Sequence, residues 1–349
     1  MIPIDKPAGH WARGGEEFVQ RIRGKIAAEP ALKGRAEVAS EFRPWSPGAQ
    51  TDFLYHAFVH TDIIGTGLLS LGLVNRVLGR PFAMTFLFYP ARQSYADAVS
   101  YRWHQARFSW RPGLIGVFRH RGRLGLSFGI PNLESQIKDA ANAENVILLQ
   151  SRLESIRRML GADYASLAGI LPSVLARLGR EDAHVARQRH LTARVVLVAL
   201  DKVMRLHALE RDTPVLVLGG KGYIAGEVLR LTDGRNVTSV DVGEFARFED
   251  FVAAHRGRPL VVVNLSRSDA LTDYLGHFWP GVVVLNEVYP EPVPTELAQL
   301  ERNGVTCHHI AGVAGGAWPP FPRAYRGGIP CCAALPLAAG EEVDVVIVH

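Results

Sequence analysis

The spacing of apolar residues along the chain changes character near residue 213. Before that point, long stretches carry apolar residues at helical spacing, whereas the run FAMTFLFY at residues 82–89 is typical of a buried strand. Two short apolar runs, at 114–118 and 124–128, flank the turn HRGR and predict a hairpin. Helices are predicted over residues 52–78 (one or two), 94–105, 133–160 (one long helix or a pair) and 187–207.

After Asp212-Thr213-Pro214, short β-branched runs alternate with amphipathic segments. This alternation predicts a parallel, doubly wound sheet with helices on both faces. Strands are expected at residues 215–218, 237–242, 260–264, 282–285 and 306–310, and helices at 225–231, 248–255 and 294–303.

A glycine-rich turn joins the first of these strands to the first helix. The sequence VLVLGGKGYIAGEVL, residues 215–229, can be aligned as Gly220-x-Gly222-x-x-Ala225 or as Gly219-x-x-Gly222-x-x-Ala225. Glycines are needed there because the turn requires positive φ and because a side chain would hold a diphosphate away from the backbone amides. The strand, turn and helix together predict a dinucleotide-binding Rossmann domain over residues 213–316. The residues expected to contact the cofactor here are Gly219, Gly220, Lys221, Gly222, Tyr223 and Ile224.

An acid stands at the end of the next strand. Asp241 follows the glycines by about twenty residues, where a carboxylate accepts the ribose hydroxyls and repels a 2′-phosphate. The sequence therefore favours NAD as the cofactor, with NADP possible because Arg247 is nearby. The remaining cofactor contacts are expected from strand ends, at Val242, Asn264, Leu265, Ser266, Gly312 and Val313.

Composition narrows the class of protein further. The 349 residues are 48% hydrophobic and 21% charged, with a formal net charge of +5, which is ordinary for a globular protein and too weakly basic to imply nucleic acid. No signal peptide or membrane-spanning segment is apparent, since the apolar stretch 63–88 is interrupted by polar residues and a proline. The three cysteines are too few for a disulfide framework. We expect a cytoplasmic protein.

The positive charge is concentrated in residues 102–123. This segment carries arginines interleaved with aromatic residues and has no acidic residue. Such a basic face is typical of a solvated strand, and it also fits an acidic partner such as an acyl carrier protein or the phosphates of coenzyme A. The arginines are Arg102, Arg107, Arg111, Arg119, Arg121 and Arg123.

The order of landmarks in the chain resembles the long-chain acyl-(acyl-carrier-protein) reductases, which belong to the shikimate-dehydrogenase-like Rossmann proteins. The resemblance covers about residues 82–337, and the glycine turn is its most specific part. The other matching segments are Leu133-Glu134-Ser135, GADYASLAGILPS (161–173) as a strand and loop, His190-Leu191-Thr192-Ala193, VVVLNEVYP (282–290) and PCCAAL (330–335). The chain departs from the family pattern at Ala225, where the motif has glycine, and at Asp241, which replaces an arginine-rich strand end.

The resemblance implies reduction of an acyl thioester to an aldehyde through an acyl-enzyme on cysteine. It places Cys331 at the nucleophile, with adjacent Cys332 as the alternative, and a helix start after Pro330 is expected to lower the thiol pKa. Glu134 falls in the matching Leu-Glu-Ser segment. Tyr289 and His190 are candidates for proton donors. Packing alone could equally explain each of these residues.

The resemblance also implies an N-terminal α/β substrate domain followed by the doubly wound Rossmann domain. The predicted division is a helical extension (1–80), the substrate domain (81–207), the Rossmann domain (208–320) and a C-terminal segment returning to the substrate domain (321–349). A homo-oligomer is possible. Shikimate dehydrogenase itself is a poorer match, because Leu133 stands where that family has its catalytic lysine.

Two other functions remain open from the sequence. One is a dehydrogenase of an alcohol, an oxo acid or an imine, in which the cysteines only pack. The other is a nucleotide-binding partner without catalysis. No metal is expected, because Cys307 and His309 share one side of a strand but have no further ligand pair at suitable spacing.

Overall fold

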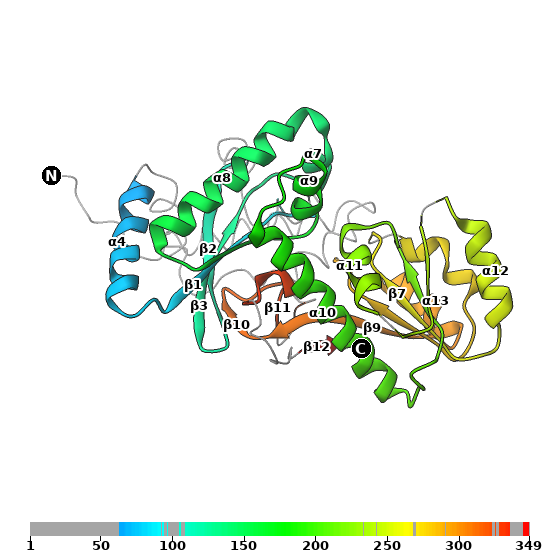
Figure 1. Cartoon of the computed structure of the whole chain (residues 1–349). Coiled ribbons are helices and arrows are strands. Elements are labelled where there is room, and N and C mark those ends of the chain that lie inside the picture. Colours follow the sequence, from blue (N-terminus) through cyan, green and yellow to red (C-terminus); the bar gives the residue numbers. More distant parts are fainter. Residues whose placement is uncertain are drawn as a thin grey trace, which may run out of the picture. The chain divides into compact units, whose positions relative to one another are not determined.

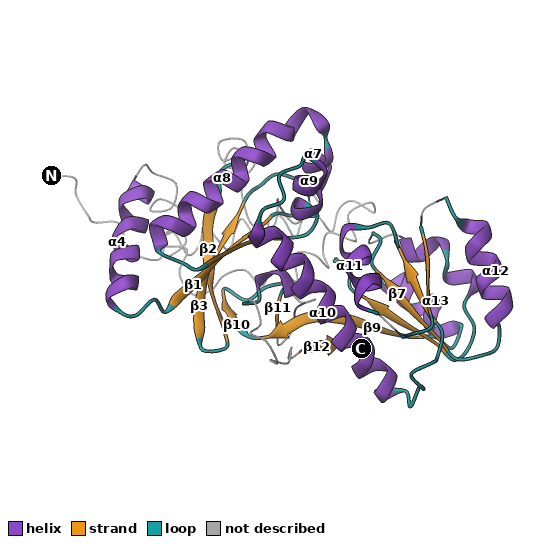
Figure 2. Ribbon diagram, viewed as in Figure 1, coloured by secondary structure: helices purple, strands orange, loops and turns teal. Residues whose placement is uncertain are grey.

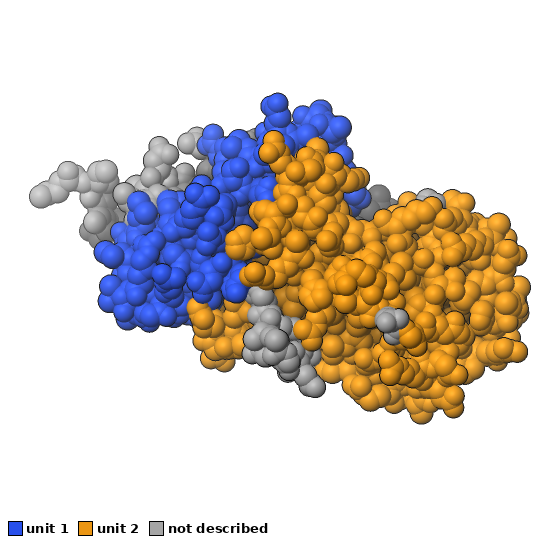
Figure 3. Space-filling model, viewed as in Figure 1, with its two compact units in different colours: residues 1–117, 124–165 blue, residues 118–123, 166–349 orange. Residues whose placement is uncertain are grey.

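The computed structural model divides into two compact units (Figure 3). Unit 1 comprises residues 1–117 and 124–165, and unit 2 comprises residues 118–123 and 166–349. The predicted division at residues 80, 207 and 320 stays a prediction. The residues that the structure describes are 63–91, 93, 96, 105, 109–232, 234–241, 243–267, 270–289, 291–322, 325, 328–335 and 345–348.

Several sequence predictions lie outside these described residues. They are the N-terminal arm, the first part of the helical stretch 52–78, most of the helix over 94–105, the arginines Arg102 and Arg107, and the cofactor candidate Val242.

Unit 1 is built on a mixed sheet in which the strand order is β2-β3-β1-β4. The predicted strand at 82–89 is confirmed as β1, which pairs in parallel with β3. The predicted hairpin is confirmed as β2 and β3, whose turn residues Arg121 and Gly122 both have positive φ (50° and 75°), as in the type I′ turn that suits strand twist. The elements are α4 (Ile63–Val77), β1 (Phe82–Phe88), β2 (Gly113–His120), β3 (Arg123–Gly129), α7 (Glu134–Lys138), η2 (Ala140–Asn142), α8 (Ala143–Leu160) and β4 (Tyr164–Leu167) (Figure 1).

The predicted helical stretch 133–160 is a pair, α7 and α8. The break occurs at Asp139, which leaves the helical conformation and accepts a hydrogen bond from the Ala141 N–H with its side chain. Helix α8 ends at Gly161, whose φ of 71° forms a left-handed C-cap. In segment 161–173 the expected strand is β4, but the expected loop gives way to helix α9 (Leu171–Arg177).

Helix α4 is held on α8 and β1 by a glycine and an asparagine. A Cβ on Gly72 would lie 1.9 Å from the Met159 carbonyl oxygen, so only glycine allows the two helices to approach this closely. The buried Asn75 amide donates to the carbonyls of Phe82 and Leu160, both at 2.9 Å. The polar residue that interrupts the apolar run is therefore a structural link between three elements.

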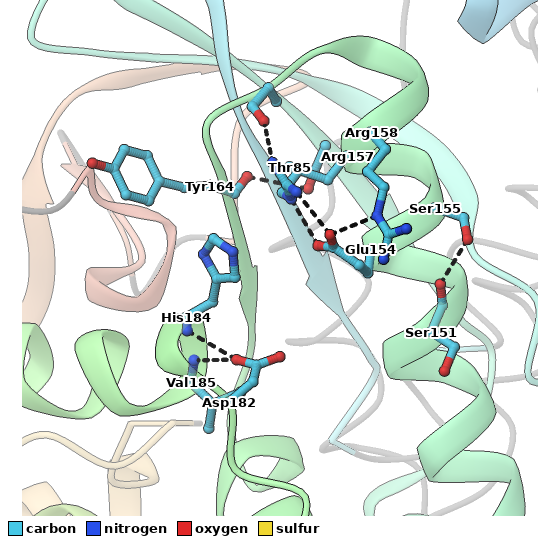
Figure 4. A network of polar contacts seen from close by, with 11 residues as sticks. Thr85, Ser151, Glu154, Ser155, Arg157, Arg158, Tyr164, Asp182, His184 and Val185 are labelled. Carbon is cyan, nitrogen blue, oxygen red and sulfur yellow. Dashed lines mark hydrogen bonds and ion pairs between the residues drawn. The ribbon is translucent and has the colours of Figure 1, made fainter.

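A branched ion pair fixes the C-terminal part of α8 (Figure 4). Glu154 accepts two hydrogen bonds from Arg157, at 2.7 Å each, and one from Arg158 at 2.9 Å. Arg157 also donates to the Ala162 carbonyl just before β4. The hydrogen bonds from Arg157 hold the pKa of Glu154 down at about 2.

Replacing this carboxylate should reduce stability in a pH-dependent way. Because the pKa of Glu154 is lower in the folded than in the unfolded chain, its stabilisation is complete above about pH 4.5 and disappears as the pH falls towards 2. We expect Glu154→Gln to lower the free energy of unfolding by about 1 kcal/mol at pH 7 and by much less at pH 2.5. Urea unfolding at both pH values measures this. An equal loss at both would show that the charge does not matter.

Unit 2 contains a seven-stranded sheet in the order β11-β9-β8-β7-β5-β6, with β12 also paired to β9. Strands β6, β5, β7, β8 and β9 run parallel, which confirms the predicted doubly wound α/β fold. Strands β11 and β12 pair with β9 in the antiparallel direction. The elements are α9, α10 (Ala183–Leu206), β5 (Val215–Leu218), α11 (Tyr223–Leu231), β6 (Val237–Val240), α12 (Phe245–His255), β7 (Leu260–Asn264), η3 (Ala270–Asp273), η4 (Leu275–His277), β8 (Val282–Asn286), α13 (Pro294–Arg302), β9 (Thr306–Ala314), β10 (Gly316–Trp318), β11 (Gly328–Ile329), η6 (Cys331–Ala333) and β12 (Val345–Val348) (Figure 2).

The central strands β5, β7 and β8 are buried on both faces, as is typical of a parallel sheet, whereas the edge strand β6 is mostly half-buried. One face packs on α12 and α13 through a cluster that includes Phe248, Val252 and Leu300. Helix α10 contacts α11, β8 and β9. Among the described residues, no helix is long and apolar enough to cross a membrane.

Candidate functional site

The glycine turn follows β5 at the point where the sheet changes direction. From β5 the chain first adds β6 on one side and then β7 on the other, so the carboxyl ends of β5 and β7 form the switch point at which such sheets bind ligands. Gly219 has φ of +88°, and a Cβ there would lie 2.7 Å from the Ser266 Cα. Glycine at this position lets the end of β5 approach the residues that follow β7.

The other glycines of the motif have different neighbours. A Cβ on Gly220 would lie 2.5 Å from the Ser239 Cβ on β6, and one on Gly222 would lie 2.9 Å from the Gly219 carbonyl oxygen. Gly222 is the N-cap of α11, and Ala225 is buried directly behind it. Gly226 has open space around it. The first three glycines make the turn compact, and the helix begins with Tyr223 and Ile224 at its positively polarised end.

Asp241 lies beside the turn, as the sequence predicts. It follows β6, and its carboxylate accepts a hydrogen bond from the Lys221 N–H at 2.6 Å. Glu244 accepts from the Asp241 N–H at 3.0 Å and pairs with the Lys221 ammonium at 2.6 Å. Arg247 lies 4.0 Å from Glu244. Two carboxylates and two cations thus surround the edge of the turn on the β6 side.

Tyr223 is part of a polar cluster at the start of α11. Its hydroxyl donates to Glu181 at 2.6 Å, and the Arg189 guanidinium lies 4.9 Å from the centre of its ring. Arg189 also pairs with Glu181 at 3.1 Å. Burial, followed by the hydrogen bond to Glu181, raises the pKa of Tyr223, so the tyrosine stays a neutral hydrogen-bond donor.

The residues after β7 are in contact with the turn. Leu265 donates its N–H to the Leu218 carbonyl at 3.0 Å, and Ser266 donates its N–H to the Asn264 side chain at 3.2 Å. Asn264 is fully buried at the carboxyl end of its strand. These three predicted cofactor residues are therefore assembled next to Gly219.

Gly312 and Val313 belong to β9 rather than to a loop. Gly312 has φ of +93°, and a Cβ there would lie 1.9 Å from the Ile329 carbonyl oxygen. Val313 is buried and is paired with Ile329 and Val345. Gly312 thus allows the segment that leads into Cys331 to lie against the sheet.

Cys331 is placed next to an acid at the same edge of the sheet. Its Sγ lies 3.9 Å from Oε1 of Glu287, the residue that follows β8. Helix α10, which carries Thr192, contacts η6, and the Thr192 and Cys332 side chains both influence the pKa of the Cys331 thiol. Cys331 and Cys332 are half-buried. Segments around residues 192, 287 and 331 thus meet at one thiol.

The predicted lowering of the thiol pKa is wrong for Cys331. The side-chain interaction with Cys332, followed by burial, raises the pKa of Cys331 well above its ordinary value, and the Thr192 side chain opposes this only in part. The expected helix start is a three-residue 3-10 turn, η6, which is too short to carry a strong dipole. Burial and the nearby Cys331 also raise the pKa of Glu287 well above 4.5. A carboxyl group with a raised pKa is a better proton acceptor near neutral pH.

The other candidate catalytic residues have partners elsewhere. His190 is bonded to Glu227 of α11 at 2.8 Å, and Glu134 belongs to unit 1, where it pairs with Lys138 at 2.5 Å. Tyr289 stacks near Tyr325, with ring centres 5.2 Å apart. The structure does not bring His190 or Glu134 to the thiol through any described contact, and catalytic roles for these three residues stay predictions.

Sequence reasoning missed Glu287, Thr192, Asn286 and the part played by His309. Glu287 was visible as an acid directly after the buried run VVVLN, the position where parallel sheets carry their functional groups. Asn286 and His309 form a buried polar row with Asn264. Cys307 packs against the core, where burial raises its pKa to about 12. Within the described ranges, no three ligand-type side chains lie close enough to hold a metal ion.

Comparison with known proteins assigns neither a family nor an activity to this chain. No protein-family model matches the sequence, and no curated protein matches it. Among solved structures, glutamate dehydrogenase from Peptoniphilus asaccharolyticus is similar with a TM-score of 0.33 and 11% identity over 65% of this chain and 64% of that one. VinN is similar with a TM-score of 0.26 and 11% identity over 80% and 79%. The chain thus spans less than two thirds of the glutamate dehydrogenase, and neither likeness assigns an activity.

The two ends of the glycine motif should respond oppositely to alanine. Gly219→Ala places a Cβ against Ser266 in a left-handed conformation, so we expect a loss of about 1–3 kcal/mol in the free energy of unfolding. Gly226→Ala, inside α11 with open space around it, should instead gain about 0.5–1 kcal/mol. Thermal or urea unfolding distinguishes them. Equal effects of the two substitutions would contradict the described turn.

Proposed function

We propose that unit 2 binds NAD(H) at the turn Gly219–Gly222 and that the protein is an oxidoreductase. The proposal is supported by the glycine turn at the switch point, the helix α11 that starts from it and the acid Asp241 at the end of β6. The diphosphate would lie at the first turn of α11, and the adenosine ribose would lie near Asp241. Asp241 and Glu244 on that side favour NAD over NADP.

The order of residues along the carboxyl edge of the sheet supports a position for the nicotinamide half of the dinucleotide near Cys331. Asp241 follows β6, Gly219 follows β5, Ser266 lies beyond β7 and Glu287 follows β8. Neighbouring strands lie about 4.8 Å apart, so Glu287 is about 10 Å along the edge from the glycine turn. A dinucleotide bound across the switch point extends over such a distance. Its nicotinamide half would then point towards the strand that carries Glu287.

We propose that the substrate is an acyl thioester and that Cys331 is the nucleophile. Glu287 would accept the proton of the Cys331 thiol as the sulfur attacks the thioester carbonyl carbon, and would return that proton to the departing thiolate. The products of this half-reaction are an acyl-Cys331 thioester and a free thiol.

Bound NADH supplies a hydride for the acyl carbon. The carbon–sulfur bond to Cys331 then breaks, an aldehyde leaves, and the Cys331 sulfur recovers a proton, for which Glu287 is the nearest described acid. The overall change consumes one NADH and one proton for each thioester, and releases one aldehyde and one thiol. Nucleophile, proton acceptor and leaving group are all provided by the Cys331–Glu287 pair.

A carrier-bound substrate fits the hairpin of β2 and β3. Arg119, Arg121 and Arg123 are exposed there, and the last two lie at or next to the turn. An acyl carrier protein presents acidic side chains, and coenzyme A presents phosphates, so either would be attracted by these arginines. The hairpin is the part of the chain that we propose for this contact.

Intact mass spectrometry after incubation with an acyl-coenzyme A tests the thiol chemistry. We expect a single acyl adduct that disappears in Cys331→Ser and persists in Cys332→Ser and in the control Cys307→Ser, since only Cys331 contacts Glu287. Glu287→Gln should slow adduct formation by about a hundredfold, because the proton acceptor is lost. If the unmodified protein forms no adduct, or Cys331→Ser forms it at the normal rate, the thioester mechanism is wrong.

A further inference from the structure

The carboxyl ends of β7, β8 and β9 are joined by a buried row of polar side chains. Asn264 donates from Nδ2 to Oδ1 of Asn286 at 2.8 Å, and Asn286 in turn lies 3.0 Å through its Nδ2 from Nδ1 of His309. The three residues are in register on neighbouring parallel strands. Their exposed fractions are 0%, 1% and 6%, so water contributes little to their solvation.

Every polar group of the Asn286 amide is used. Its Oδ1 accepts from Asn264, and its Nδ2 donates both to His309 and to the Val288 carbonyl, the latter at 2.8 Å. Because the amide donates to Nδ1, the proton of His309 belongs on Nε2. Burial lowers the pKa of His309 to about 4, which keeps the ring neutral and this arrangement intact at ordinary pH.

The hydrogen bond from the Asn286 side chain to the Val288 carbonyl affects the backbone of Glu287, the residue between them. Glu287 lies between Asn286 and Val288, so the hydrogen bond from Asn286 closes a short loop around it. The Glu287 N–H is also tied to the Asn264 carbonyl at 3.2 Å. Residues of the row therefore fix the backbone on both sides of the carboxylate that contacts Cys331. Asn264 and Asn286 lie on the same face of the sheet as the core residues Val262 and Val284, two positions earlier on their strands. Glu287 is the next residue after Asn286.

We propose that Asn286 is a positioning residue for Glu287 and acts on Cys331 only through that carboxylate. This inference rests on the proposed role of Glu287 as proton acceptor. A buried amide with all its hydrogen bonds made is a rigid support, whereas an apolar replacement would remove the partner of the Asn264 Nδ2, of the His309 Nδ1 and of the Val288 carbonyl in this row. The row also reaches Ser266 and hence the glycine turn through the Asn264 side chain.

The test is a double-mutant cycle on thiol reactivity. The alkylation rate of Cys331 by iodoacetamide is followed by peptide mass in the full-length protein, in Asn286→Leu, in Glu287→Gln and in the double variant. Asn303→Leu is the matched control, because Asn303 also donates from Nδ2 to a backbone carbonyl, that of Leu275 at 2.8 Å, but in α13's C-cap. Circular dichroism confirms folding, and Asn286→Ala replaces the leucine variant if the latter does not fold.

We expect Asn286→Leu alone to slow alkylation of Cys331 about tenfold. In the Glu287→Gln background the same substitution should slow it less than about twofold. The control Asn303→Leu should leave the rate unchanged. The same slowing in both backgrounds, or none in either, would overturn the role of Asn286. If Glu287→Gln itself leaves the rate unchanged, the proposed function fails at its proton acceptor, which is a separate and recognisable result.

Discussion

The structure of unit 2 depends on one close approach, that of the backbone at Gly219 to the backbone at Ser266. A Cβ at Gly219 would lie 2.7 Å from the Ser266 Cα, so the ends of β5 and β7 can meet only with glycine there. This contact is at the switch point of the parallel sheet, where α11 begins. Asp241, which follows β6, accepts a hydrogen bond from the Lys221 N–H of the same turn. Ser266 in turn bonds to Asn264, which connects the turn to the row of side chains that ends at His309. The candidate nucleotide site and the candidate thiol site are thus parts of one sheet edge.

Burial gives the thiol site its chemical character. In water a glutamic acid is ionised at neutral pH and is a weak base, but burial raises the pKa of Glu287 and makes it a stronger proton acceptor. The interaction with Cys332, followed by burial, raises the pKa of Cys331, so the proposed reaction requires a proton acceptor beside the thiol. Gly312 contributes to the position of Cys331. Because Gly312 has no side chain, the Ile329–Pro330 segment can lie on β9, and Cys331, which follows it, lies beside Glu287. The Cys331–Glu287 contact is a product of packing rather than of a local helix dipole.

The sequence predicted the parallel sheet, the glycine turn and Asp241 because these follow from local patterns: short buried strands, a strand–turn–helix motif and an acid at a strand end. Element ends were less accurate. Helix α10 starts at Ala183, earlier than predicted, because Asp182 caps it by accepting from His184 and Val185, and β9 extends to Ala314 because β11 and β12 pair with it. Residues 192, 287 and 331 are far apart in the chain, and only the folded sheet brings them together. The Asn264–Asn286–His309 row was not predicted. In the sequence, a polar residue at the end of a run of β-branched residues indicates only the end of a strand.

Calorimetric titration of the purified full-length protein with NADH and with NADPH tests the central claim most directly, since the proposed oxidoreductase activity requires a dinucleotide at the glycine turn. The account predicts saturable binding of NADH with one site per chain and weaker binding of NADPH, because Asp241 and Glu244 lie on the side proposed for the adenosine ribose. Absence of binding by both nucleotides would contradict the account as a whole. Tighter binding of NADPH than of NADH would leave the site in place but contradict the role assigned to the two carboxylates.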